Sequence, residues 1–291
     1  MVTGITNTGS LGDSLPTIID SARIVREYEG VMMGRVDSTT LREGTGLQFD
    51  EISLAQLSAQ GVNEDTVLNN PQQLSDTLFS IRPTMIGIQT VITDRVRRRI
   101  SGNVAAKIGS LAQNAMQRKK DEDLLTVLDG ATTSLGGAGS TLTSGIISAA
   151  VSRIKGNTTE AAITEISTVL HPFQVKDLQD ELTSSVGTYE LTMGDTKEIF
   201  RQGYKGPVSG SMVYEDGNMT IDGSDDAKGG VFAREAIVFV QGASPKAEPD
   251  RWPYYGGGAD VLYMYDEYGI GERSAGNWLY EVYTDALAPT S

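Results

Sequence analysis

The fold of this protein is decided by residues 93–129, which read TDRVRRRISGNVAAKIGSLAQNAMQRKKDEDLLTVLD. This stretch contains no proline. As one continuous helix it would be about 50 Å long, at ~1.5 Å per residue. That is longer than a typical helix in a compact domain. We therefore predict a long helix from Thr93 to Asp129 that acts as a beam, with other elements laid across it.

The apolar residues of this helix recur mainly at steps of four, at Val96, Ile100, Val104, Ile108, Leu111 and Ala115. Each step of four advances the stripe by about 40° around a helix of 3.6 residues per turn. The stripe therefore winds, and it would contact different neighbours along the helix. A change from basic to acidic residues leaves a break near residue 120 open, but no Gly or Pro marks one, so we favour a continuous helix.

The first turns of the helix carry four arginines within five positions, Arg95, Arg97, Arg98 and Arg99. The helix dipole disfavours cations at this end by about 0.3 kcal/mol or more each. The four side chains also point in several directions, so one partner within the chain cannot pair with all of them. A purely local design would not place them there.

Residues 30–76 are a second unusual segment. The runs VMMGRVDSTTL (31–41) and GLQFDEISL (46–54) flank four turn-like residues, which predicts a two-stranded hairpin turning near Gly44. Isolated hairpins are marginally stable in water, and the long polar stretch that follows is of a kind that is usually functional or disordered. We predict a hairpin that is ordered by lying on another subunit; a floppy insertion is the alternative.

The rest of the chain predicts an α+β region. The expected elements are one or two strands over 77–92, a helix over 143–155, a strand over 165–170, a helix over 172–182, an apolar strand ending near Val240, a Pro- and Gly-rich return connection over 244–258, and two closing strands over 259–272 and 277–286 joined by a hairpin loop.

Composition narrows the possible functions. The 291 residues are 39% hydrophobic, enough for a core, and the net charge of −14 disfavours binding to nucleic acid or to an anionic membrane. The chain has no cysteine, which removes disulfides, thiolate metal sites and cysteine nucleophiles. It shows no targeting region and no apolar run of the ~18 residues needed to span a bilayer. We expect a soluble intracellular protein.

No pattern in the sequence assembles an active site. His171 is the only histidine, and no G-x-S-x-G motif accompanies it, so we interpret it as structural. The acidic loop 215–226 lacks the calcium-binding spacing, and SLGGAGS (134–140) lacks the Lys-Ser/Thr of a phosphate loop. We therefore predict no catalytic residue, no cofactor and no metal, and no specific nucleic-acid binding by the arginines.

Taken together, the order of elements resembles that of tailed-bacteriophage major capsid proteins, the Johnson fold. The runs TVLHPFQVKDLQDEL (168–182) and DEYGIGERSAGNWLYEVYTDALAPTS (266–291) add to this resemblance. It implies an α+β coat fold divided into an N-terminal arm (1–29), an extended hairpin loop (30–76), a peripheral domain (77–142) with the spine helix (93–129), an axial domain (143–241) and return strands of the peripheral domain (242–291).

The resemblance also implies a function. The protein would be a structural, non-enzymatic subunit that assembles in the host cytoplasm into hexamers and pentamers. These would form the icosahedral capsid of a virion, which encloses double-stranded DNA without reading its sequence. Scaffolding, portal and decoration proteins would be partners, and no membrane would be involved. The residues expected at contacts between subunits are Arg35, Arg42, Glu43, Asp50, Glu51, Arg95, Arg97, Arg98 and Arg99.

Two departures from the family qualify this expectation. Some members cross-link a loop lysine to a neighbour, but here no lysine precedes Lys107, so we predict no covalent link. The chain also begins only a short way before the hairpin, so we expect any scaffolding to be a separate protein. The alternatives are an encapsulin-like shell that holds cargo protein and, from a different class, an acidic hydrolase or a β-rich binding protein.

Overall fold

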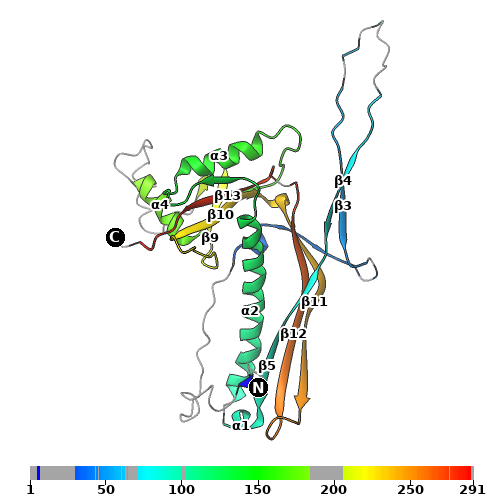
Figure 1. The fold of residues 1–291 in the computed structure, drawn as a ribbon, viewed down its shortest axis with the longest axis vertical. Helices are drawn as coiled ribbons and strands as arrows, with labels where there is room; N and C mark the ends of the chain where they lie inside the picture. Colours follow the sequence, from blue (N-terminus) through cyan, green and yellow to red (C-terminus); the bar gives the residue numbers. More distant parts are fainter. Residues whose placement is uncertain are drawn as a thin grey trace.

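The computed structural model describes residues 5–6, 30–42, 44, 46–59, 61–62, 64, 71–99, 102–183, 206–274 and 276–289, without the side chains of 102–107 and 182–183. Of the predicted N-terminal arm, only the short strand β1 (Ile5–Thr6) is among them. A long helix and a long β-sheet run side by side. A second sheet with two helices lies at one end of them, and a hairpin projects from the same end (Figure 1).

The long helix exists, but the prediction of one helix from Thr93 is wrong at its start. A single turn, α1 (Asp94–Arg97), comes first, and Arg98 and Arg99 form a turn. The main helix, α2, spans Gly102–Asp129 and continues through residue 120. No Gly or Pro lies at the change of charge near residue 120, in agreement with the uninterrupted helix there.

The buried stripe of α2 keeps the predicted step of four but takes a different phase. Leu111 is exposed, whereas the positions one residue later are buried. The buried stripe runs through Ala112, Met116, Lys120, Leu124 and Leu128. The pattern of apolar residues does not predict this stripe, because its central position is Lys120 and a lysine is rarely buried unless it is paired.

The long sheet is five-stranded, in the order β1-β5-β12-β11-β2. Its bounds are β5 (Thr84–Thr93), β12 (Ala259–Glu272), β11 (Ile237–Trp252) and β2 (Asp37–Thr40). β11 does not end near Val240 as predicted but pairs with β12 as far as Trp252↔Ala259. Beyond Gln241, its pairing among the described residues is with β12 alone, and such an edge tolerates the prolines that had indicated a connection.

The second sheet is six-stranded, in the order β6-β13-β10-β7-β9-β8. Its strands are β6 (Ser134–Gly136), β13 (Leu279–Asp285), β10 (Asp226–Ala233), β7 (Ile166–Leu170), β9 (Ser211–Glu215) and β8 (Pro207–Val208). The helices α3 (Ser144–Lys155) and α4 (Pro172–Thr183) confirm the predictions for this region, as does β7.

Alternate residues of this sheet enter two different cores. Val231 and Ala233 pack with α3 and α4, while Phe232 packs with Leu124 and Leu128 of α2. Because neighbouring residues of a strand point to opposite faces, the sheet is buried between α2 on one side and the two shorter helices on the other. The end of α2 thus joins this sheet to the long one.

Two predicted hairpins are wrong, because their strands pair elsewhere. Met32–Gly34 is a short 3-10 helix, η1, and β2 after it pairs with β11. The projecting hairpin is instead formed by β3 (Phe49–Leu54) and β4 (Asp76–Ile81). At the C-terminus, β12 belongs to the long sheet and β13 to the six-stranded sheet. In both cases a more distant strand offered a longer or better buried partner than the neighbouring one.

A buried ion pair attaches α2 to the long sheet. Lys120 Nζ lies 2.5 Å from Asp266 Oδ2 of β12, and the two side chains are 7% and 2% exposed. The ammonium also lies over the rings of Phe239 and Tyr268, at 5.6 and 5.5 Å from their centroids. Gln241 donates to the second oxygen of Asp266, so both carboxylate oxygens have partners. Removing one partner would leave the other charge buried and unpaired.

We therefore expect Asp266→Ala to lower the free energy of unfolding by about 3–5 kcal/mol, because Lys120 loses its counter-charge in a dry site. The double variant Lys120→Met/Asp266→Leu should recover most of this loss. Lys119→Met, which removes an exposed pair with Asp123, should cost less than about 1 kcal/mol. Urea denaturation measures all three. A double variant as unstable as the single one would contradict the assignment.

Candidate assembly surfaces

The base of the projecting hairpin is fastened to the long sheet by close packing. A Cβ on Gly269 of β12 would lie 2.6 Å from a methyl carbon of Ile81, and a Cβ on Gly271 would lie 2.9 Å from the ring of Phe79. Only glycine permits this approach. Ile81 also joins Val238 and Val240 in a small buried cluster. The hairpin therefore leaves the body of the molecule in a fixed direction.

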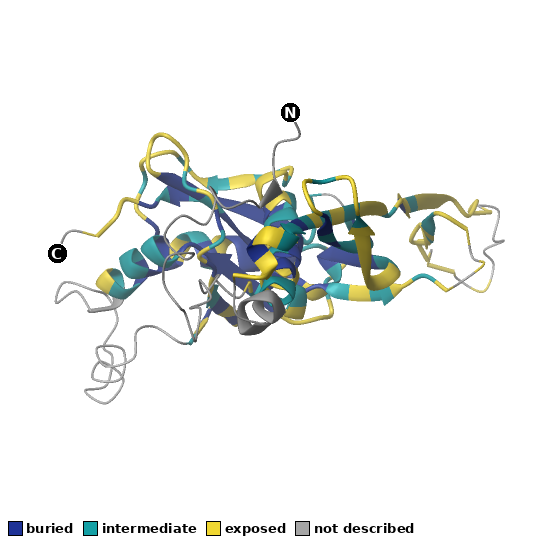
Figure 2. Ribbon diagram, turned by 90° about the horizontal axis from the view of Figure 1, so that it is seen from below, coloured by how far each residue is buried: buried dark blue, intermediate teal, exposed yellow. Residues whose placement is uncertain are grey.

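The opposite face of the hairpin is apolar and uncovered. Ile52 and Leu78 are directly paired across the two strands and are 62% and 60% exposed, and Leu54 beside them is 67% exposed. This end of the molecule is coloured mostly as exposed in Figure 2. The exposed apolar side chains on and near the hairpin are Leu47, Ile52, Leu54, Leu57, Val62, Leu74 and Leu78. A concentration of this kind marks an interaction site.

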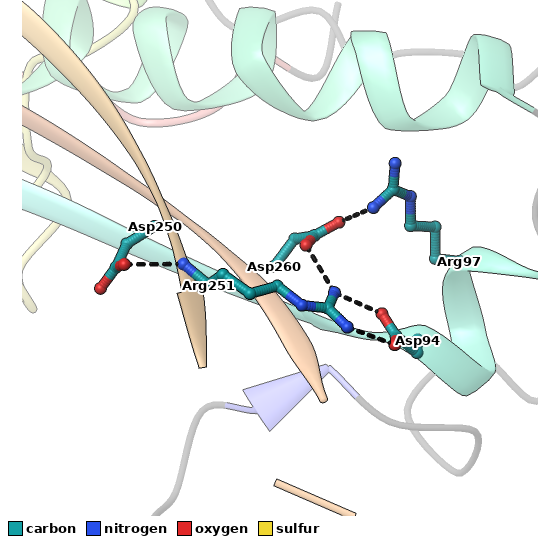
Figure 3. Close-up of polar contacts among 5 residues, drawn as sticks. All are labelled: Asp94, Arg97, Asp250, Arg251 and Asp260. Atoms are coloured by element: carbon teal, nitrogen blue, oxygen red, sulfur yellow. Dashed lines mark hydrogen bonds and ion pairs between the residues drawn. The ribbon is translucent and has the colours of Figure 1, made fainter. Parts of the chain in front are cut away.

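A polar network occupies the far end of the long sheet, where α1 meets the β11–β12 turn (Figure 3). Arg251 of β11 donates from both terminal nitrogens to the carboxylate of Asp94, at 2.6 and 2.5 Å, and also to Asp260, at 2.7 Å. Arg97 pairs with the other oxygen of Asp260. The hydrogen bonds that Arg251 donates to Asp94 hold the pKa of Asp94 below its usual range, and the positive charges of Arg251, Arg98 and Arg97 act in the same direction.

The arginine run is thus divided. Arg97 pairs with Asp260 within the chain, while Arg95, Arg98 and Arg99 are exposed and do not share this partner. For Arg95 and Arg99, no side-chain hydrogen bond or ion pair forms with any residue that the structure describes. Arg98 lines the same shallow depression as Asp94 and Arg251.

The remaining predicted contact residues have varied surroundings. Arg35 stacks on the ring of Tyr214, 3.9 Å from its centroid, and Glu51 pairs with Arg273 at 2.8 Å. Both are therefore at least partly used within the chain. Arg42 and Asp50 are exposed on the hairpin segment, and Glu43 lies outside the described residues. The structure brings none of the four described residues next to the arginines in and directly after α1, which lies at the opposite end of the molecule (Figure 1).

Sequence reasoning missed three residues that organise these surfaces. Arg251 and Asp260 complete the network around Asp94, and Arg273 pairs with both Asp37 and Glu51 at the base of the hairpin. No local pattern identifies them, because their partners are more than 150 residues away along the chain, apart from the Arg251–Asp260 pair itself. The apolar face was readable in principle from the alternation of Ile52 and Leu54 with polar residues.

His171 and the acidic loop 215–226, which were considered as possible catalytic or metal-binding groups, form hydrogen bonds with nearby backbone amides. His171 is buried, where its Nδ1 accepts a hydrogen bond from the amide of Phe173 at the start of α4, and burial lowers its pKa. Asp222 accepts hydrogen bonds from the amides of Ser224 and Asp226 within its own turn. No cluster of three or more His, Cys, Asp or Glu among the described residues is placed to hold a metal ion. None of the described helices is long and apolar enough to cross a membrane.

Comparison with solved structures identifies the fold. The capsid asymmetric unit of cyanophage Pam1 superposes with a TM-score of 0.71 at 11% identity, covering 99% of this chain and 100% of that one. The capsid of Ralstonia phage GP4 gives 0.70 at 14% identity, covering 98% and 100%. This chain has the phage coat-protein fold. The predicted α+β coat fold is therefore confirmed.

A chain of Mycobacterium phage Che8 superposes equally well on the coat-protein fold of this protein. Its TM-score is 0.71 at 17% identity, and the match covers 91% of this chain and 94% of that one. No protein-family model matches the sequence, and no curated protein matches it. The fold is thus recognisable in three dimensions although neither a family model nor a curated protein matches the sequence.

The network in Figure 3 makes a prediction for Asp94. In Arg251→Ala, the pKa of Asp94 should rise from its lowered position, because its largest stabilising hydrogen bond is lost. In the parent, stability from this pair is present above the usual pKa of Asp and is lost as the pH falls through the lowered one. NMR titration of the Asp94 carboxyl in unassembled subunits measures this, with Arg153→Ala as the control. An unchanged pKa in Arg251→Ala would refute the role of Arg251.

Proposed function

We propose that this chain is a major capsid protein whose copies assemble into hexamers and pentamers of an icosahedral shell around double-stranded phage DNA. The observation that carries the proposal is the projecting hairpin, which is firmly anchored at its base and apolar on its free face. The likeness to phage capsid structures over nearly the whole chain supports it.

The hairpin face fits a contact between copies better than an isolated subunit. Ile52, Leu54 and Leu78 gain nothing from the chain's own core, and burying each would contribute about 1.5–3 kcal/mol. Because the hairpin of one copy would lie on a different surface of the next, the contact is heterologous. Repeated around an axis, such contacts close into rings.

Charge gives a second contact between copies. The exposed arginines of α1 lie on a chain with a net charge of −14, so acidic surfaces of neighbouring copies are available to them. In this proposal Arg95, Arg98 and Arg99 face a neighbour, as do Arg42 and Asp50 at the hairpin. The same net charge would let packaged DNA lie against the shell without sequence-specific binding.

The remaining parts of the proposal follow from the coat role. The chain would act as a structural subunit without enzymatic activity, assembled in the host cytoplasm and located in the virion capsid. The long sheet with α2 would form the peripheral domain, and the six-stranded sheet with α3 and α4 would form the axial domain. β6 and β13 then belong to the axial domain and not, as predicted from the sequence, to the peripheral domain, because both strands pair within the six-stranded sheet. Scaffolding, portal and decoration proteins would be separate partners. Contacts between subunits would be non-covalent.

Electron microscopy of the expressed chain tests the proposal. Shells, or free hexamers and pentamers, are the expected products, and a monomer that never assembles under any condition would contradict it. Nuclease-protected DNA inside particles isolated from the natural source supports the capsid function. Shells that instead contain a bound cargo protein would favour the encapsulin-like alternative.

The apolar hairpin face makes a specific prediction. Ile52→Asp/Leu78→Asp should leave the urea midpoint of the unassembled subunit nearly unchanged, because both side chains are already in water. Particle yield should fall at least about tenfold, since two buried charges would face the neighbour. Ile163→Asp is the control, because Ile163 is more exposed still, at 91%, and lies outside the hairpin. Normal assembly of the hairpin variant would exclude this face as a contact.

Charge reversal tests the arginine end. Arg97→Glu/Arg98→Glu should impair assembly more than folding, because Arg97 loses only an exposed pair with Asp260 inside the subunit. Arg153→Glu/Arg234→Glu makes the same change of charge on other exposed residues and serves as the control. Particle counts by electron microscopy and urea midpoints give the two readouts. Equal losses of assembly and stability would remove the assignment of this end as a contact between copies.

A further inference from the structure

Two carboxyl groups meet inside the protein where the described chain resumes after the N-terminal residues. Asp121 lies on α2, and Asp216 follows β9. The two residues are 2% and 0% exposed. Asn218 binds one oxygen of each group, through its backbone amide and its side chain, so the two carboxyl groups lie next to each other. Two ionised carboxylates this close in a buried site repel each other, so we expect one of the two groups to carry a proton.

Together the two carboxyl groups hold the backbone of residues 31–32. The amide of Val31 donates to Asp216 Oδ2 and the amide of Met32 donates to Asp121 Oδ1, both at 3.2 Å. Asn218 bridges the pair, because its backbone amide donates to Asp216 Oδ1 and its side chain to Asp121 Oδ2, both at 2.9 Å. A Cβ on Gly30 would lie 1.9 Å from Asp121 Cγ, so the segment passes directly over this carboxyl.

The cations on the surrounding elements are engaged elsewhere. Three cations of α2 have acidic partners: Arg118 pairs with Glu122, Lys119 with Asp123 and Lys120 with Asp266. Beside η1, Arg35 stacks on the ring of Tyr214. On β10, Lys228 pairs with Asp129. The other titratable groups nearby are Glu215, Asp222, Asp226 and His171. Burial lowers the pKa of His171, which favours its neutral form. Among the described residues, none forms an ion pair with either carboxyl. Within the part of the chain that the structure describes, a proton on one of the two groups is therefore what neutralises the pair.

We propose that Asp121 and Asp216 form a proton-dependent latch, in which a proton on one of the two groups fastens residues 30–32 to α2 and its loss loosens them. These residues lead directly into η1 and β2, which pairs with β11 of the long sheet. Met32 is fully buried in the core that contains Leu124 and Phe239. Loosening would therefore act at the joint between the N-terminal residues and the long sheet. This inference does not depend on assembly of the chain.

The direction of the pH effect follows from the surroundings. Burial, and after it the neighbouring Asp121, raises the pKa of Asp216 from 3.8 to about 7. Between these two values the latched state holds a proton that the open or unfolded chain has released. The latch is therefore most stable below the usual pKa of Asp, weakens as the pH rises towards about 7, and levels off above it.

Hydrogen exchange of the full chain tests the latch. After correction for the intrinsic exchange rate, protection of the Val31 and Met32 amides should fall by up to about tenfold per pH unit between pH 5 and 7 and then level off. In Asp216→Asn, the side chain has no proton to lose, so protection should be independent of pH. It should also be lower than in the parent at pH 5, because the Asn nitrogen cannot accept one of the two backbone amides that Asp216 binds. Asp225→Asn, an exposed change in the same connection, should keep the slope of the parent.

Two further variants keep the test decisive. Asp121→Asn also supplies a neutral partner, and it should remove the slope if Asp216→Asn fails to fold. Gly30→Ala should give low protection at every pH, because the methyl group displaces the Asp121 carboxyl. Constant protection in the parent between pH 5 and 7 would overturn the proposal. The slope of the parent persisting in both Asn variants would overturn it as well.

Discussion

The rest of the structure depends on the attachment of α2 to the long sheet by the buried ion pair between Lys120 and Asp266. A helix of 28 residues presents only a narrow stripe to its neighbours, and in this chain a charged residue sits in the middle of that stripe. Desolvation makes such a charge costly unless its partner is in place. The pair therefore specifies one position of the helix along β12. From that position, Leu124 and Leu128 reach Phe239 of the long sheet and Phe232 of the six-stranded sheet. One contact thus aligns both halves of the molecule.

The two parts of the molecule differ in how far their apolar surfaces are buried within the single chain. The six-stranded sheet is covered on both faces, so its apolar residues are satisfied within the subunit. The hairpin is different, because one face packs closely on Gly269 and Gly271 and the other meets water. A single chain cannot cover both faces of a two-stranded element that projects away from its body. In the proposed assembly, a neighbouring copy buries the exposed apolar face of the hairpin.

Charged residues serve two separate purposes in this protein. Some organise the subunit itself: Arg251 joins Asp94 to Asp260 at one end of the long sheet, and Arg273 joins Asp37 to Glu51 at the other. Others, such as Arg95 and Arg99, remain exposed. The pair of Asp121 and Asp216 belongs to neither group, because it is buried and no cation among the described residues pairs with it; in our proposal it relies on a proton. The backbone that it holds leads into η1 and β2.

The sequence by itself determined the long helix and the elements of the α+β region from Ser144 to Thr183, and it indicated that residues 30–76 contain a projecting hairpin, although with the wrong pair of strands. These features depend on periodicity, on a proline at a helix start and on the absence of a core for residues 30–76, all of which are local properties. Only the tertiary structure decided which strands pair. β3 joins β4 across a long loop, β11 continues past its prolines, and β12 and β13 separate into different sheets. It also decided the phase of the helix stripe and the ion pairs of Lys120, Arg97 and Arg251. The physical reason is that strand pairing and burial of charge depend on partners far along the chain, whose energies no local pattern contains.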